Sequence, residues 1–294
     1  MVTRKKLILG IGVLILGLLG MVLPVIGEDG GTTDLQDLIN KADRAARDAR
    51  MDKKVEDRLR DAIDIYEKAL EIDPDNRHVL NRLSVGYFTL AETYFEKGAS
   101  KEAYRTGYHY GLRSLKVNED FSELYDRIGF KALKKLPKSV TNVETLFWTG
   151  ANLGRLDETK GVLGSLNDLP ALVSLNRRVL EVDETYLGGG AHRALGSIAG
   201  ELMSRLPFSF LQVQNNGFTW KKARTHFEQA IEIAPNCLEN YFSYAKYYAH
   251  KRGKTEMTIR LLDRVKSEPA GDEFSLINRI AKEKASRLRE KVSN

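Results

Sequence analysis

The chain has 294 residues, which is enough for one large or two modest domains with a buried core. Its 46 Lys and Arg residues exceed its 40 Asp and Glu residues, and the signs alternate along the C-terminal segment. This alternation favours a solvated helix surface over a nucleic-acid-binding patch. The single cysteine, Cys237, excludes an internal disulfide and a structural zinc site built on two or four cysteines.

The N-terminus carries a signal for export or membrane insertion. Basic residues at positions 4–6 precede an uncharged, largely apolar stretch at 7–27. This stretch is long enough to span a bilayer, but Val25 and Gly27 also suit a cleavage site. Residues 1–27 are therefore predicted to be a cleaved signal peptide or a retained transmembrane anchor. In both cases the charge bias places residues 28–294 on the exported side of the cytoplasmic membrane, periplasmic or extracytoplasmic.

Two later segments share small, aromatic, small and proline residues at offsets of 0, 4, 7 and 12. The copies are Ala62, Tyr66, Ala69 and Pro74, and Ala223, Phe227, Ala230 and Pro235. The first three positions form one stripe of a helix, where a neighbouring helix can cross closely, and the proline ends the helix. The pattern resembles the second helix of a tetratricopeptide repeat, a unit of two antiparallel helices.

Weaker copies of the pattern follow in the same frame around residues 104–119, 172–185 and 257–269. Helical periodicity covers nearly all of the chain after the N-terminal segment, apart from a short β-like excursion, FSFLQVQ, at residues 208–214. We therefore expect an all-α fold of about five helical hairpins in one continuous solenoid over residues 28–294. A polar segment from Glu273 onward is predicted to be the terminal capping helix.

Three consecutive glycines at residues 188–190 stand ahead of an apolar helical run. They lack the Gly-Lys-Ser/Thr ending of a phosphate-binding P-loop, and Arg193 stands where a dinucleotide motif has its last glycine. A tight corner between packed helices is the favoured interpretation. An anion site made by backbone amides with His192 and Arg193 stays open as the alternative.

A longer series of weak motifs resembles one family. Leu146-Phe-Trp148-Thr-Gly-Ala is followed by a segment ending in Leu-Pro, a helix end NRRVLEVDETY186, the glycine-rich HRALGSIAGELMSRLP and KARTHFEQAIEIAPN. This order, over roughly residues 55–270, is similar to the T-component family of tripartite ATP-independent periplasmic (TRAP) transporters.

The resemblance implies an exported helical solenoid without catalytic activity that pairs with the substrate-binding protein of the transporter. It also implies association as a trimer and a channel lined for small organic or hydrophobic ligands. Characteristic members are lipoproteins, whereas this chain has no cysteine at residues 20–30, so lipid attachment there is excluded. A different hypothesis is an envelope-assembly or chaperone-like protein that binds peptides or protein partners.

No catalytic group, metal site or cofactor site is predicted. The five histidines are scattered along the helices without an acidic partner at metal-ligand spacing. Aromatic residues are too crowded for all of them to face one core stripe, so some are expected to line a binding surface. The predicted ligand- or partner-binding residues are Phe147, Trp148, Tyr186, His192 and Arg193.

Overall fold

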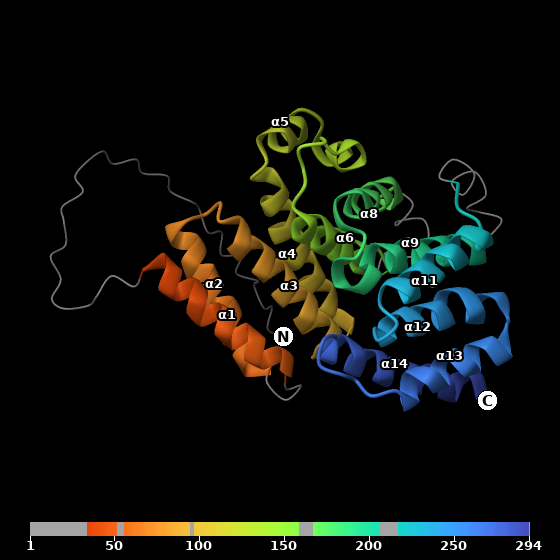
Figure 1. Cartoon of the computed structure of the whole chain (residues 1–294). Helices are drawn as coiled ribbons and strands as arrows, with labels where there is room; N and C mark the ends of the chain where they lie inside the picture. The colour runs from red at the N-terminus through yellow and green to blue at the C-terminus, as the bar shows by residue number, and fades with distance from the viewer. Residues whose placement is uncertain (1–33, 52–55, 95–96, 159–166, 206–216, 294) are drawn as a thin grey trace, which may run out of the picture. The chain divides into compact units, whose positions relative to one another are not determined.

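The computed structural model describes residues 34–51, 56–94, 97–158, 167–205 and 217–293. Within these ranges every regular element is helical, as predicted (Figure 1). The α-helices are α1 (Leu35–Met51), α2 (Glu56–Ile72), α3 (Arg77–Thr93), α4 (Lys97–Lys116), α5 (Glu119–Ile128), α6 (Val143–Glu158), α8 (Leu169–Asp183), α9 (Tyr186–Ser204), α11 (Trp220–Ile233), α12 (Leu238–Tyr244), α13 (Thr255–Ser267) and α14 (Ser275–Ser293). Short turns of other helix types are η1 (Gly129–Lys135), η2 (Ala245–Ala249) and η3 (His250–Arg252).

The helices pack in successive pairs along the chain. α1 contacts α2, α3 contacts α4, α6 contacts α8, α9 contacts α11, and α12 contacts α13 (Figure 1). Each pair also touches the next, through α2 and α3, α4 and α6, α8 and α9, and α11 and α12. Such packing buries one face of each helix against a neighbour in sequence, which is the arrangement that the repeated pattern predicted.

The repeated pattern lies on the buried faces of α2 and α11. Ala62 and Ala69 have no exposed surface, and Tyr66 between them is 1% exposed. In α11, Ala223, Phe227 and Ala230 are all fully buried. The small residues let the paired helix approach, and the aromatic ring fills the space between them. After α2, the side chain of Asn76 accepts a hydrogen bond from the amide of Val79 and caps α3.

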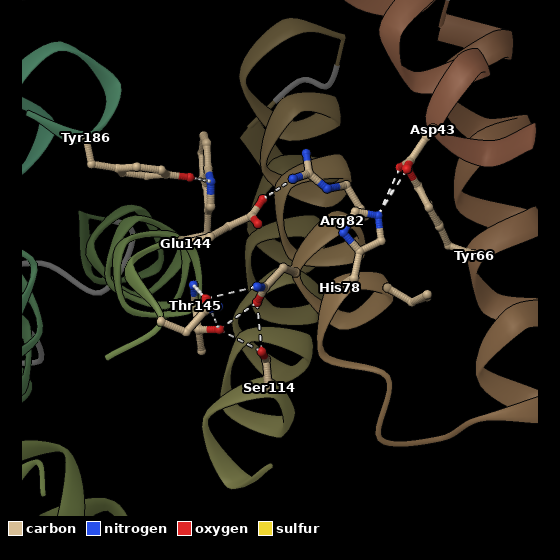
Figure 2. A network of polar contacts seen from close by, with 12 residues as sticks. Asp43, Tyr66, His78, Arg82, Ser114, Glu144, Thr145 and Tyr186 are labelled. Carbon is tan, nitrogen blue, oxygen red and sulfur yellow. Dashed lines mark hydrogen bonds and ion pairs between the residues drawn. The ribbon is translucent and has the colours of Figure 1, made fainter. Parts of the chain in front are cut away.

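Polar side chains join α3, α4 and α6 inside the packed helices. The Oδ1 atom of Asn81 accepts hydrogen bonds from the hydroxyls of Ser114, at 2.7 Å, and Thr145, at 2.9 Å (Figure 2). Arg82 on α3 pairs with Glu144 on α6 at 2.6 Å (Figure 2). Because buried polar atoms need such partners, this network fixes how the three helices sit on one another.

Two features of the fold have no counterpart in the predicted hairpins. The short helix α5 and the 3-10 turn η1 lie between α4 and α6, with Phe121 and Leu133 fully buried in the core beneath them. Second, α12 continues into the π-helical turn η2, in which each turn holds one residue more than an α-helix.

The helix predicted from Glu273 onward begins at Ser275 as α14. Asn278 fixes its first turns, because its side chain accepts from the amide of Leu238 at 2.7 Å and donates to the carbonyl oxygens of Asn236 and Ala270. α14 packs on α12 and α13, as a capping helix should, but it also contacts α1. The last helix therefore lies beside the first helix that the structure describes.

Several sequence predictions concern residues outside the described ranges. The predicted signal or anchor at 1–27 and the β-like segment at 208–214 both lie there. Among the helices that the structure does describe, none is long and apolar enough to cross a membrane.

Candidate functional site

A cavity of about 470 Å³ opens among the helices of the middle and C-terminal pairs. Its wall comes from α3, α6, α8, α9, α12 with η2, and α14. Ligand pockets in proteins typically measure about 300–1,000 Å³ and are mostly apolar with a few polar groups. Much of this wall is apolar, including Phe88, Phe147, Trp148, Leu187, Ile198 and Ile280.

Three predicted site residues meet at one side of the cavity. The rings of Phe147 and Trp148 lie edge to face, with their centroids 5.2 Å apart, and Phe147 also contacts the ring of Tyr186 at 5.5 Å. The indole N–H of Trp148 donates to the hydroxyl of Tyr186 at 3.2 Å (Figure 2). Phe147 and Trp148 line the cavity, whereas Tyr186 stands behind them and holds the indole in place.

The glycine run forms the bend that introduces α9. Leu187, Gly188 and Gly189 have left-handed backbone angles, with φ of 50°, 63° and 75°. A Cβ atom on Gly189 would stand 2.9 Å from the Cα of Ala230, so only glycine allows α11 to pass this closely. The amides of Gly188 and Gly189 both donate to the carbonyl of Thr185, so these two donors are used within the bend.

Leu187 is the only non-glycine residue of the described chain with positive φ. A branched side chain in this conformation costs about 1–2 kcal/mol, so the packing around it must compensate. Its side chain lines the cavity. The bend therefore places an apolar group on the wall of the cavity.

His192 and Arg193 are neighbours in sequence but point to different surroundings. His192 is 5% exposed, and its Nδ1 lies 2.9 Å from Nδ1 of His226 on α11. It does not line the cavity. The two histidines are 34 positions apart in the sequence, and the α9–α11 hairpin brings their rings together.

Burial lowers the pKa of both histidines. For His226, electrostatic interactions with His192, Lys222 and Arg177 act in the same direction, and its pKa falls to about 4. Glu184 partly offsets the shift at His192. The pair is therefore neutral at physiological pH, with one ring donating to the other.

Arg193 does reach the cavity wall. Its guanidinium donates to Oδ1 of Asn240 at 2.6 Å and contacts the sulfur of Cys237 at 3.9 Å. Asn240 is fully buried, and its amide group donates to the carbonyls of Gly188 and Ala230. The glycine bend and Asn240 therefore hold Arg193 in position. Cys237 is buried and forms no disulfide.

A buried charge network, which the sequence did not predict, forms another part of the wall. The carboxylate of Glu92 on α3 pairs with Arg155 on α6 at 2.8 Å and with Lys284 on α14 at 2.5 Å, and it accepts from the hydroxyl of Tyr104 at 2.6 Å. Burial alone would raise the pKa of Glu92, but Arg155 and Lys284 outweigh it and lower the pKa to about 2. Glu92 is therefore ionised at physiological pH.

The network continues from Arg155 to the π turn. Arg155 pairs with Glu158 at 3.1 Å, and Glu158 accepts from the hydroxyl of Tyr247 at 3.3 Å. Lys246 donates to the same hydroxyl at 2.7 Å. A Cβ atom on Gly200 of α9 would collide with the carbonyl oxygen of Tyr247, so this glycine lets α9 pack directly on the π turn.

Together these features form a cavity with an apolar aromatic side and a charged side. Within the described residues, no group of three or more His, Cys, Asp or Glu side chains could hold a metal ion. Aromatic crowding in the sequence did indicate Phe147 and Trp148. The charged residues gave no such signal, because each stands among other charged residues on a helical segment and only the fold brings them together.

A family model described as "TRAP transporter T-component" matches residues 53–294, which is most of the chain. No curated protein matches it.

Proposed function

The chain belongs to the TRAP transporter T-component family, and from that premise we propose that it is a non-catalytic binding scaffold of a TRAP-type transporter that takes a small organic ligand into the cavity. The cavity is the observation that carries this proposal. The cavity has a volume of about 470 Å³, an aromatic side at Phe147 and Trp148, and polar groups held in fixed positions.

The proposed partner is the substrate-binding protein of the transporter. A scaffold beside that protein would need to lie on the exported side of the membrane, and the basic, then apolar, residues 1–27 are suited to take it there. We further propose that these residues tether the chain if they are not cleaved, and that the chain associates as a trimer.

A chaperone-like protein that binds extended peptides is the competing function. Peptide-binding solenoids use an open concave surface. Here α14 contributes Leu276, Ile277 and Ile280 to the wall of the cavity, and this arrangement favours a compact ligand over an extended chain.

The test is a pull-down of the tagged full-length chain from detergent-solubilised membranes of its own cells, followed by mass spectrometry. Recovery of a solute-binding protein encoded beside a membrane permease is the expected result. A matched variant, Ala151→Phe, places a ring in the cavity, and Ala99→Phe places one on an exposed face of α4. Only the first should prevent retention of a small molecule. Recovery of unrelated peptides with no solute-binding protein would refute the transporter role.

A further inference from the structure

The described residues that line the cavity carry equal numbers of positive and negative side chains. Five are cationic and five are anionic: Arg155, Arg193, Arg205, Lys246 and Lys284, with Glu92, Asp157, Glu158, Glu201 and Glu239. A ligand with a net charge would leave one charge in this partly open cavity without a counter-charge, which costs free energy where the surrounding protein is of low dielectric. The balance therefore favours a ligand that is neutral overall.

Most of these charged side chains form ion pairs with one another. Glu92 and Glu158 pair with Arg155, Glu92 also pairs with Lys284, and Glu201 pairs with Arg205 at 3.1 Å. Such pairs are part of the wall and have little left to offer a ligand.

Three other charged groups on the wall form no ion pair within the described residues. Arg193 donates to the neutral Asn240, and Lys246 donates to the hydroxyl of Tyr247. The carboxylate of Glu239 accepts a hydrogen bond from the hydroxyl of Ser243 at 3.3 Å. A guanidinium has five N–H donors and an ammonium three, so both cations keep donors for a ligand. Glu239 keeps acceptor capacity for a ligand cation.

The three groups lie close together in the fold. Glu239, Ser243 and Lys246 follow each other at spacings of four and three along α12 and η2, and all three line the cavity. Residues at these spacings share one helix face. Arg193 on α9 lines the same cavity and lies beside the start of α12, where its guanidinium contacts Asn240 at 2.6 Å and the sulfur of Cys237 at 3.9 Å. One short stretch of wall therefore presents two cations and one anion.

The rest of the ligand would face apolar groups. The single N–H donor of Trp148 is taken by Tyr186, so its indole presents only apolar surface to the cavity. Phe88, whose ring centroid lies 5.2 Å from that of Trp148, and Ile198 extend this apolar side.

From these observations, and resting on the proposed function of the cavity as a small-ligand site, we propose that the ligand is a zwitterion with a large apolar side chain, such as a hydrophobic amino acid. Its carboxylate would lie against Arg193 and Lys246, its ammonium group against Glu239, and its side chain against Phe88 and Trp148.

The test measures binding of three probes to the purified full-length chain in detergent by isothermal titration calorimetry. Phenylalanine carries both charges, 3-phenylpropionate lacks the ammonium group, and 2-phenylethylamine lacks the carboxylate. Phenylalanine should bind at least about tenfold more tightly than either analogue, because each analogue leaves a charged wall group unpaired.

Variants then assign the two charges. Glu239→Gln should weaken phenylalanine about tenfold and leave 3-phenylpropionate unchanged, because only the ammonium contact is lost. Lys246→Met should weaken both carboxylates and spare 2-phenylethylamine. The control Glu232→Gln changes an exposed carboxylate on α11 and should alter none of the three affinities.

Each of the following outcomes would overturn the proposal that the ligand is a zwitterion. If 3-phenylpropionate binds as tightly as phenylalanine, the ligand is a simple acid, and if 2-phenylethylamine binds best, it is a cation. In both cases the proposed small-ligand function would stand. If none of the probes binds at millimolar concentration, the ligand class is wrong, whereas the transporter role is judged separately by the pull-down.

Discussion

Glu92 on α3 and Lys284 on α14 form an ion pair at 2.5 Å although 192 positions separate them in the sequence. Both side chains are largely shielded, at 9% and 20% exposure.

Replacing Lys284 by Met leaves Glu92 paired only with Arg155, so we expect a loss of roughly 1–3 kcal/mol in the free energy of unfolding. Urea denaturation of the full-length chain measures it. Lys291→Met, at an exposed position on the same helix, should change stability by less than about 0.5 kcal/mol. Equal losses in both variants would show that the pair adds nothing.

The contact between α9 and the π turn depends on Gly200. Gly200→Ala inserts a methyl group where the carbonyl oxygen of Tyr247 lies, and the helices must separate. We expect a loss of about 2 kcal/mol, even though alanine is the better helix former by about 1 kcal/mol. Differential scanning calorimetry measures it. Gly98→Ala is the matched control, since no atom lies near its added Cβ, and it should be neutral or stabilising.

The neutral histidine pair makes stability depend on pH. The pKa of His226 is about 4 in the folded chain, against 6.5 for an ordinary histidine, so the unfolded chain binds more protons between these values. Stability is therefore complete above pH 6.5 and falls as the pH drops toward 4, by as much as about 3 kcal/mol at 1.4 kcal/mol per pKa unit. In His226→Gln this part of the fall should vanish, whereas Gln229→Ala, exposed on the same helix, should keep it. Melting curves at intervals of pH between these limits provide the comparison.

The hydrogen bond between Trp148 and Tyr186 stiffens the aromatic side of the cavity. Trp148→Phe and Tyr186→Phe each remove one partner, and the double variant removes both. The losses in unfolding free energy of the two single variants should add up to about 0.5–1.5 kcal/mol more than the loss in the double variant. This difference is the contribution of an ordinary buried hydrogen bond. Additive losses in the unfolding free energies would mean that the two groups do not interact.

The helical pairs could be predicted from the sequence because their information is local. In α2, Ala62, Tyr66 and Ala69 recur on one face, and Pro74 follows the end of the helix, all within 13 residues. Phe147 and Trp148, which the sequence predicted as binding residues from its crowded aromatic residues, both lie on the wall of the cavity. Such patterns need no knowledge of distant segments.

The charged side of the cavity could not be predicted in this way. Glu92, Arg155 and Lys284 are ordinary helix residues by type, and their meeting depends on how every intervening pair is stacked. The sequence also gives no sign of the π turn, because Ala245–Ala249 has the composition of an α-helix. It forms where packing of the surrounding helices outweighs the local preference.

The π turn limits how the length of this helix can vary during evolution. One residue beyond the α-helical count shifts the phase of everything after it, so α12 and the segment beyond η2 are out of step by about 100°. Deleting a single residue there would restore a regular helix and rotate the following turn, η3, relative to α9, which it contacts. Variation in length at Ala245–Ala249 is thus expected to be far rarer than substitution, and a relative that lacks the extra residue should have a differently shaped cavity.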